Sequence, residues 1–565
     1  MRARRCHFGY AAGGVDPETD ADALGAAYER SLPRDRRRRE GVFYTPPALA
    51  RDLVEATVGR VLAGGAAEPR VMDPACGGGA LLVAAYRRLL AWHAGEGQVT
   101  AALRRRILER SIFGVDVDPD AVEVTRRALA QIADTDVDVA GNIRVGDALL
   151  AEDPRTFDVV LANPPYVDAE AMTRHHAALR AACHGRYEAA AGNWDLFCVF
   201  IERCIECCAM GGRVGMIVPN KLLSADYARA ARGLLVRPGM SALASIQVFD
   251  HSNECAESVF AAGVYPIALV AARGGTQGEV VIEHMAGPGA VASRVVLAGE
   301  VFADSSRPWA LCAGEEGRLV ARVRAAGRPL GELAEVRGAA TVAEAYAIAG
   351  LVREGQAGLR MINSGTIDAY EHLWGRKRMR YLGATYLCPV IPGESLHGLP
   401  AKRLADARAP KVIVSGMTRT PEAVLDRDGT LLAGKSTTIV TGPAIDLRYV
   451  VALLNSAMMG WYYRAVYGGD RLSGGYLRIG PPQIRQVPVV APDGRAAAEI
   501  AGLVEVMMTR PSSAISRAID AAVAAVFGLG AEEVAWIDVR SRTTPRSPGP
   551  AAMRTITSGP PVQAR

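Results

Sequence analysis

Between residues 70 and 300, short apolar runs alternate with longer amphipathic stretches. The apolar runs are typical of buried strands, and the stretches between them have the periodicity of helices. This alternation predicts a parallel sheet with helices on both faces, which is a doubly wound, Rossmann-like α/β fold. We expect strands at residues 70–72, 112–117, 142–145, 157–162, 212–218, 244–249 and 265–271.

The pattern changes after residue 300. A segment containing Ser and Pro near residue 305 interrupts the alternation, and the chain beyond it mixes strands at 411–414 and 437–440 with a helix at 447–463. This mixture predicts a second domain of the α+β class. We expect an N-terminal helical arm at 1–40, the α/β domain at 41–300, a linker at 301–329, the α+β domain at 330–490, a helical segment at 491–539 and a disordered, Pro- and Ser-rich tail at 540–565.

The composition is that of a globular, multidomain chain. The 565 residues are 50% hydrophobic and 22% charged, which is enough for two or three cores. The net charge of +5 identifies no partner by itself, although Arg residues cluster near 34–39 and 376–380. No apolar run approaches the roughly 20 residues of a membrane helix, and no apolar signal segment follows the first Arg residues. We therefore expect a cytoplasmic protein that contacts no membrane.

The cysteines favour a reducing compartment, since the ten Cys residues show no paired spacing. Cys204, Cys207 and Cys208 resemble one half of a zinc site, but no second cluster follows at ligand spacing. We interpret them as buried thiols on a core helix and expect no metal.

A glycine-rich turn follows the first predicted strand, in the sequence DPACGGG from Asp73. Glycines let the backbone approach a ligand closely. The next two strands end at Asp116, which suits the hydroxyls of a ribose, and at Asp147, which suits the amino group of an adenine. Each Asp alone is as typical of a helix cap, but three adjacent strand ends favour a nucleoside site. No Lys-Ser or Lys-Thr follows the glycines, so S-adenosyl-L-methionine fits better than a nucleoside triphosphate.

The fourth predicted strand ends in Asn163-Pro164-Pro165-Tyr166. Two prolines leave a rigid extended turn whose carbonyls lack competing N–H groups. The Asn163 side-chain oxygen and the Pro164 carbonyl can accept the two hydrogens of a planar amino group, which frees its lone pair to attack an adjacent sulfonium methyl group. Tyr166 offers a ring on which the base can stack, and an adenine in a duplex must be flipped out to reach this turn.

These motifs stand in the order found in gamma-class adenine-specific DNA methyltransferases of bacterial restriction-modification systems, and residues 22–300 resemble that family, in a Type IIG-like form without a nuclease domain. FYTPP at residues 43–47 resembles the segment that helps bind the methionine end of the cofactor, and Phe200 matches an aromatic that packs on the cofactor's adenine. The resemblance implies a bacterial enzyme with catalytic residues Asn163, Pro164, Pro165 and Tyr166. It implies cofactor contacts at Tyr44, Thr45, Pro46, Asp73, Ala75, Gly77, Gly79, Asp116, Val117, Asp147, Ala148, Asn163 and Phe200.

Residues 330–490 resemble the target-recognition domain of Type IIG-related enzymes. The resemblance implies double-stranded DNA as a partner and leaves open a separate restriction endonuclease or defence-system subunit. Candidate DNA contacts are Tyr265, Arg376, Lys377, Arg378, Lys435, Ser436 and Arg471. Two alternatives remain open: an RNA or protein glutamine methyltransferase that uses the same Asn-Pro-Pro-Tyr chemistry, and a non-catalytic DNA-binding subunit.

Overall fold

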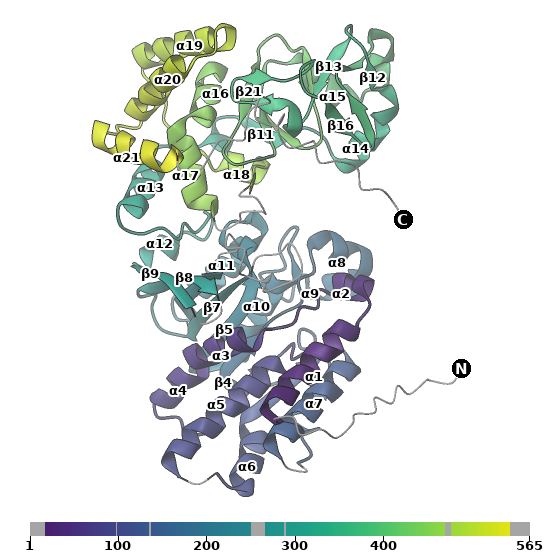
Figure 1. Ribbon diagram of the computed structural model, residues 1–565, viewed down its shortest axis with the longest axis vertical. Helices are drawn as coiled ribbons and strands as arrows, with labels where there is room; N and C mark the ends of the chain where they lie inside the picture. The colour runs from purple at the N-terminus through teal and green to yellow at the C-terminus, as the bar shows by residue number, and fades with distance from the viewer. Residues whose placement is uncertain are drawn as a thin grey trace, which may run out of the picture. The chain divides into compact units, whose positions relative to one another are not determined.

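The chain divides into two units, Met1–Ser306 and Arg307–Arg565 (Figure 1). The structure, a computed structural model, describes residues 17–97, 99–134, 137–249, 266–287, 290–468 and 476–542. The division falls inside the segment 301–329. Within this segment, helix α13 (Gly314–Ala326) buries Leu319, Val320 and Val323 in the core of the second unit.

A nine-stranded sheet forms the centre of the first unit, in the order β3-β2-β1-β4-β5-β7-β6-β8-β9. Its strands are β1 (Val71–Asp73), β2 (Ile112–Asp116), β3 (Ile143–Val145), β4 (Phe157–Ala162), β5 (Cys208–Pro219), β6 (Ser241–Phe249), β7 (Pro266–Arg273), β8 (Val280–Gly287) and β9 (Ala290–Leu297). The strands β3, β2, β1, β4 and β5 run parallel to one another, so the carboxyl ends of β1, β2, β3 and β4 meet at one edge.

The predicted α/β fold class is confirmed, but the sheet is mixed rather than parallel. Strand β7 runs antiparallel between β5 and β6, and β8 and β9 extend the sheet beyond the predicted strands. The apolar runs predicted the strands but carry no information on their direction. Residue 265, the first of the predicted strand at 265–271, lies outside the described residues.

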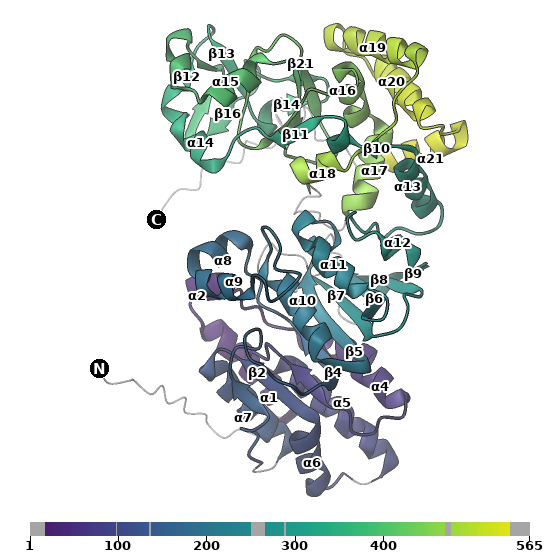
Figure 2. The same cartoon turned by 180° about the vertical axis from the view of Figure 1, so that it is seen from behind.

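Helices cover both faces of this sheet. Helices α3 and α5 lie on the side facing the viewer in Figure 1, and α10 and α11 on the side facing the viewer in Figure 2. The helices of this unit are α1 (Pro17–Ser31), α2 (Arg34–Glu40), α3 (Pro47–Val54), α4 (Arg60–Ala63), α5 (Ala80–Glu96), α6 (Ala101–Ser111), α7 (Pro119–Ala133), α8 (Ala169–His175), α9 (Ala177–Cys183), α10 (Leu196–Cys207), α11 (Arg229–Leu235) and α12 (Glu300–Ala303).

Helix α10 explains the cysteine cluster. Cys204 and Cys207 lie on α10, Cys208 begins β5, and all three are free and buried. Burial raises the pKa of the Cys208 thiol to about 12, so it stays a neutral, apolar group. The interpretation of these residues as buried thiols is confirmed.

The second unit contains two four-stranded sheets, in the orders β11-β23-β19-β21 and β12-β18-β13-β22, and four smaller strand pairs. Its strands are β10 (Arg328–Pro329), β11 (Glu335–Gly338), β12 (Arg353–Glu354), β13 (Leu359–Ile362), β14 (Ile367–Asp368), β15 (Glu371–His372), β16 (Met379–Tyr381), β17 (Ala384–Tyr386), β18 (Pro389–Ile391), β19 (Lys411–Ser415), β20 (Met417–Thr418), β21 (Ala423–Asp426), β22 (Leu431–Ala433), β23 (Thr437–Thr441), β24 (Leu477–Arg478) and β25 (Pro488–Val489).

Helices pack beside these sheets. Besides α13, they are α14 (Val342–Ala347), α15 (Ala401–Arg408), α16 (Leu447–Asn455), α17 (Ala457–Tyr467), α18 (Pro481–Arg485), α19 (Gly494–Thr509), α20 (Ser513–Val526) and α21 (Ala531–Arg542). The single helix predicted at 447–463 is wrong, because it breaks at Ser456. The Ser456 hydroxyl donates to the Leu453 carbonyl at 2.8 Å and accepts from the Met459 amide at 3.1 Å, which caps α17.

The helices at 491–539 share one core with the rest of the second unit. Ile500, Ile519 and Ile537, from α19, α20 and α21, are buried with residues of α16 and α17. Among the described residues, no helix has the length and hydropathy needed to cross a membrane.

Candidate active site

A cavity of about 440 Å³ opens at the carboxyl ends of β1, β2 and β4 in the first unit. Of the predicted site residues, it is lined by Tyr44, Thr45, Asp73, Ala75, Gly77, Asp116, Val117, Asp147, Ala148, Asn163, Pro165 and Phe200. Pro46, Gly79, Pro164 and Tyr166 are not among its lining residues. The structure thus brings the glycine turn, the acidic strand ends and the Asn-Pro-Pro-Tyr turn to one cavity, as the sequence predicts for adjacent parallel strands.

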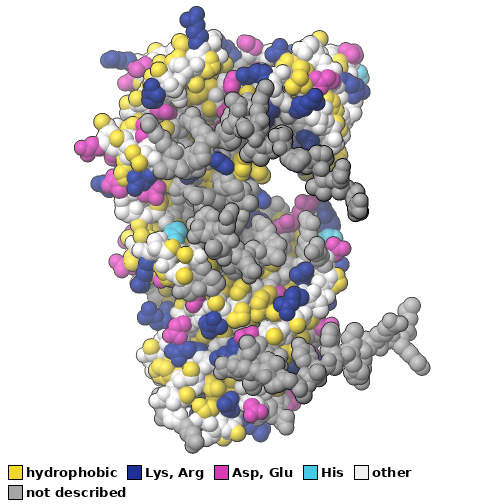
Figure 3. Space-filling model, in the orientation of Figure 1, with side chains coloured by type: hydrophobic (Ala, Val, Ile, Leu, Met, Phe, Trp, Pro, Cys, Tyr) yellow, Lys and Arg dark blue, Asp and Glu magenta, His cyan; other side chains and the backbone are white. Residues whose placement is uncertain are grey.

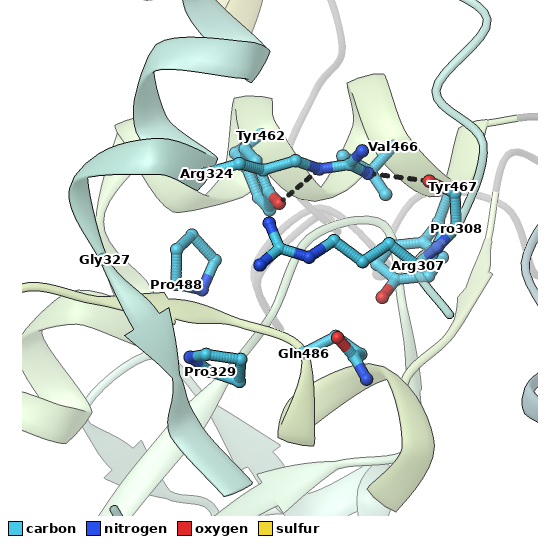
Figure 4. A pocket seen from close by; sticks show the side chains of 10 residues that line it. All are labelled: Arg307, Pro308, Arg324, Gly327, Pro329, Tyr462, Val466, Tyr467, Gln486 and Pro488. Atoms are coloured by element: carbon cyan, nitrogen blue, oxygen red, sulfur yellow. Dashed lines mark hydrogen bonds between the residues drawn. The ribbon is translucent and has the colours of Figure 1, made fainter. Parts of the chain in front are cut away.

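A second pocket, in the second unit, has room for about 10 Å³ and is filled by its own side chains (Figure 4). The Arg324 guanidinium donates to the Tyr462 hydroxyl at 3.1 Å and to the Pro308 carbonyl at 3.0 Å, and Arg307 points into the same space. This volume is the size of one water molecule. The large cavity of the first unit is therefore the candidate active site.

The glycine turn is shaped by its backbone and by Asp116. Gly77 and Gly79 have φ angles of 50° and 86°, which an L side chain rarely adopts. The Gly77 amide donates to Asp116 Oδ2 at 2.9 Å, so the turn and the second strand end are held together. Gly79 shapes the turn from outside the cavity.

Burial raises the pKa of two acids in the cavity. Burial raises the pKa of Asp73 to about 8. The hydrogen bond that Asp73 Oδ1 accepts from the Ala75 amide at 2.9 Å lowers this pKa, but burial has the larger effect. Burial also raises the pKa of Asp116, although amide donors at Asp118 and Gly77 counteract it. Asp147 accepts a bond from the Leu149 amide at 2.9 Å on Oδ1. All three of these carboxyl groups line the cavity.

The side chain of Asn163 is oriented by the segment at residues 43–45. Its Nδ2 donates to the Phe43 carbonyl at 3.1 Å and to Thr45 Oγ1 at 3.0 Å. Because a carbonyl only accepts hydrogen bonds, the amide nitrogen must face Phe43 and the oxygen must face the other way. Asn163 Oδ1 is buried and accepts no hydrogen bond from the residues that the structure describes. Asn163, which lines the cavity, thus has a buried acceptor that no described residue uses.

The Asn-Pro-Pro-Tyr turn is anchored to the same segment by Tyr166. The Tyr166 amide donates to the Gly41 carbonyl at 3.0 Å, and its ring lies 5.0 Å from the ring of Phe43, tilted by 35°. Tyr166 therefore packs behind the turn in this structure and does not line the cavity. The prediction that its ring stacks on a base stays a prediction.

The N-terminal helices supply cavity residues that the sequence did not predict. Tyr28, Glu29, Arg36 and Glu40 line the cavity, and so does His176, whose Nε2 lies 3.2 Å from the Arg39 carbonyl of α2. Helix α1 packs on α7, far along the sequence. The amphipathic pattern of a helix shows that one face is buried but does not identify the element that covers it. These contacts therefore cannot be predicted from the local sequence.

Two groups of predicted DNA contacts meet in the second unit. Lys435 and Ser436 lie in the turn between β22 and β23, whereas Arg376, Lys377 and Arg378 precede β16, and all five are exposed. The consecutive residues Asn363 and Ser364 connect the two groups. Asn363 Nδ2 donates to the Arg380 carbonyl at 3.2 Å, and Ser364 Oγ donates to the Ser436 carbonyl. Tyr265 and Arg471 lie outside the described residues.

The described residues on the face shown in Figure 3 form no large basic field. There, Lys and Arg side chains are interspersed with acidic ones. Arg376 itself is paired with Glu371 at 2.7 Å, which leaves Lys377 and Arg378 as the stronger candidates for phosphate contacts.

Two family models match the chain. Residues 110–241 match the Eco57I restriction-modification methylase, and residues 391–489 match the TaqI-like C-terminal specificity domain. Each model matches only a part of the chain. The first match includes the strand ends at Asp116 and Asp147 and the Asn-Pro-Pro-Tyr turn. The predicted resemblance to restriction-modification methylases with a recognition domain is thereby confirmed.

Two Type II methyltransferases are similar to part of the chain. The Type II methyltransferase M.PaeR7I of Pseudomonas aeruginosa is 30% identical over 175 residues, which are 30% of each chain. The Type II methyltransferase M.XhoI of Xanthomonas vasicola is 29% identical over 193 residues, or 33% of this chain and 34% of that protein. The matched segments therefore span about a third of the relatives' length.

The fold matches a solved structure over most of the chain. The Type IIL restriction-modification enzyme MmeI, solved in complex with DNA, aligns with a TM-score of 0.57 and 13% identity. The alignment covers 93% of this chain and 81% of MmeI. At this identity the match shows the fold alone.

Proposed function

We propose that this chain is a site-specific DNA methyltransferase that acts on the N6 amino group of a flipped-out adenine, with S-adenosyl-L-methionine as methyl donor. The unused acceptor of Asn163 carries this proposal. Its Oδ1 is buried just after β4 without a hydrogen-bond donor among the described residues, and Asn163 is one of the residues that line the cavity of about 440 Å³. A buried acceptor without a donor is costly, and a bound amino group would satisfy it.

The Asn-Pro-Pro-Tyr turn is suited to a weak nitrogen nucleophile. In the bound state, Asn163 Oδ1 and the Pro164 carbonyl would each accept one hydrogen of the adenine amino group, and the nitrogen lone pair would leave the plane of the ring. Both acceptors are fixed before the base arrives, Asn163 by its bonds to Phe43 and Thr45. A fixed polar arrangement of this kind lowers the barrier because it needs no reorganisation during the reaction.

The cofactor half of the cavity is suited to a cationic nucleoside. S-adenosyl-L-methionine supplies an electrophilic methyl group on a positively charged sulfur. Asp116 would accept hydrogen bonds from the ribose hydroxyls, Asp147 would accept one from the adenine amino group, and Phe200 would pack against the adenine ring; all three line the cavity. The glycine turn, held by the bond between Gly77 and Asp116, leaves room for the ligand backbone to approach.

The specificity-domain match favours double-stranded DNA as the substrate over RNA or a protein glutamine. We propose that the second unit reads the target sequence and that the chain is the modification part of a bacterial restriction-modification or phage-defence system, acting in the cytoplasm. A separate restriction endonuclease or defence subunit is the partner expected of such a system. The intact set of Asp73, Asp116, Asp147 and Asn163 argues against a silent DNA-binding subunit.

Expression in a host that lacks adenine methylation tests this proposal. Single-molecule sequencing of the host DNA is expected to show N6-methyladenine in one fixed sequence motif. The Asn163→Ala variant, expressed to the same level, is the control and is expected to leave the motif unmodified. A folded wild-type protein that produces no methylated adenine would overturn the proposed function.

A further inference from the structure

Helices α1 and α2 are held against the cofactor half of the cavity by specific contacts. A Cβ on Gly25 of α1 would lie 2.9 Å from the carbonyl oxygen of Gly78 in the glycine turn, so the two backbones are in direct contact. The Asp22 carboxylate pairs with Arg87 of α5 at 2.8 Å, and the Arg36 guanidinium pairs with Asp118 at 2.8 Å. The helices therefore form a wall of the cavity and bring their own side chains to it.

Glu29 is the acidic side chain on this wall that no contact explains. It lines the cavity, and its carboxylate makes no hydrogen bond or ion pair with any residue that the structure describes. Burial raises the pKa of Glu29 to about 8, and the Arg37 charge on α2 counteracts burial only in part. A half-buried carboxylate without a partner is unfavourable unless a ligand supplies the opposite charge.

Glu29 lies at the end of the cavity that contains Tyr44. The Tyr44 hydroxyl donates to the Asp22 carbonyl of α1 at 3.3 Å. Burial raises the pKa of Tyr44 to about 12, and the charges of Asp22 and Glu29 contribute to the increase. The Asp116 carboxylate, assigned to the ribose, lies at the glycine turn. Glu29 therefore faces the part of the ligand that the segment at residues 43–47 would hold.

We propose that Glu29 binds the α-ammonium group of the amino-acid moiety of the cofactor through a charge-assisted hydrogen bond. This inference rests on the proposed function, since it assumes a nucleoside with a cationic amino acid in the cavity. A metal ion is a poorer occupant, because no group of three or more His, Cys, Asp or Glu residues is gathered as a ligand set in the described part of the chain. The N-terminal arm thus contributes to recognition of the cofactor.

Three related ligands separate the chemical groups that Glu29 can contact. S-adenosyl-L-methionine has both the ammonium and the sulfonium, S-adenosyl-L-homocysteine keeps the ammonium but has a neutral sulfur, and 5′-methylthioadenosine lacks the amino acid. Isothermal titration calorimetry with each ligand is carried out on the wild type and on Glu29→Gln. The control is Asp35→Asn, which removes an equivalent charge from an exposed position of α2 outside the cavity.

Glu29→Gln is expected to weaken the first two ligands by about tenfold or more and to leave 5′-methylthioadenosine unchanged. The proposal would be overturned if the affinity for all three ligands fell equally, or if no affinity changed. It would also be overturned if only the affinity for S-adenosyl-L-methionine fell, because Glu29 would then contact the sulfonium instead. If Glu29→Gln does not fold, Glu29→Asp is the second variant. It keeps the charge but withdraws the carboxylate by one methylene, and the same pattern is expected. A wild type that binds none of the ligands would contradict the proposed function itself.

Discussion

Asn163 and Thr45 are joined by a 3.0 Å hydrogen bond from the amide nitrogen of Asn163 to the hydroxyl of Thr45, across 118 positions of the sequence. With the bond to the Phe43 carbonyl, it uses both hydrogens of the Asn163 amide. The FYTPP segment, which the sequence assigns to the methionine end of the cofactor, therefore has a second role. It holds the side chain that we propose to receive the target amino group.

The first prediction concerns Thr45. Thr45→Val keeps the shape of the side chain but removes the acceptor for Asn163 Nδ2. We expect kcat to fall roughly 10- to 100-fold, because the Asn163 oxygen is then less firmly placed. The measurement is methyl transfer at saturating cofactor and DNA, together with cofactor affinity by calorimetry.

The matched control is Thr45→Ser, which keeps the hydroxyl and is expected to retain most of the wild-type kcat. A Thr45→Val variant with unchanged kcat and strongly weakened cofactor binding would show that Thr45 serves the cofactor only. That result would refute the positioning role.

The second prediction concerns the buried Asp73. Its pKa in the folded protein is about 8 and lies above the value of an unfolded Asp. Its contribution to stability is therefore fully present below the unfolded pKa and is lost as the pH rises through the folded pKa of about 8. The free energy of unfolding, measured by urea denaturation, should therefore decrease between pH 6 and pH 9. We expect this decrease to be smaller in Asp73→Asn than in the wild type.

Glu29, whose folded pKa is also raised to about 8, acts in the same direction, so the loss is reduced rather than abolished. An Asp73→Asn protein whose stability declines with pH as steeply as the wild type would contradict this account of the buried carboxyl.

The meeting of the glycine turn and the acidic strand ends at one cavity was predictable because each of these features is local. The glycine turn at Gly77, Asp116 and Asp147 each follow a strand directly, and adjacent parallel strands end at the same edge of a sheet. The order of the motifs therefore determines their meeting point once the strands are recognised. The positions of Asn163 and Pro165 follow in the same way from β4.

The contacts that the sequence did not predict depend on packing over long distances in the chain. Nothing near Glu29 indicates that α1 folds back on α7, and nothing near Thr45 indicates a bond to Asn163. The direction of β7 and the break at Ser456 were missed for similar reasons, since hydrophobic patterns give neither strand direction nor a cap inside an apolar helix. The proposed DNA contacts stay predictions.

The third prediction tests the wall formed by α1. Gly25→Ala places a methyl group about 2.9 Å from the Gly78 carbonyl oxygen, so one of the two backbones must move. Overpacking of this kind costs about 1–3 kcal/mol. We expect weaker cofactor binding, measured by calorimetry, with little change in DNA affinity. The control is Ala23→Ser on the exposed side of α1. Unchanged cofactor affinity in Gly25→Ala would indicate that α1 is dispensable for the cavity.

The fourth prediction concerns the cations before β16. Replacing Lys377 and Arg378 by Ala is expected to weaken DNA binding and to lower the slope of log K against log salt concentration by about two. Arg376 is left intact because Glu371 already pairs with it. The control variant replaces Arg510 and Arg517, which are exposed on or beside the C-terminal helices. A salt slope equal to that of the wild type would place the phosphate contacts elsewhere.

The most direct test of the central claim is the chemical identity of the methylated nucleoside. Purified protein is incubated with unmethylated genomic DNA and methyl-labelled S-adenosyl-L-methionine, and the DNA is digested to nucleosides and analysed by mass spectrometry. The account predicts label in N6-methyldeoxyadenosine, reduced about 100-fold or more in Asn163→Ala although that variant still binds cofactor and DNA. Label in another nucleoside, or an Asn163→Ala rate equal to that of the wild type, would contradict it.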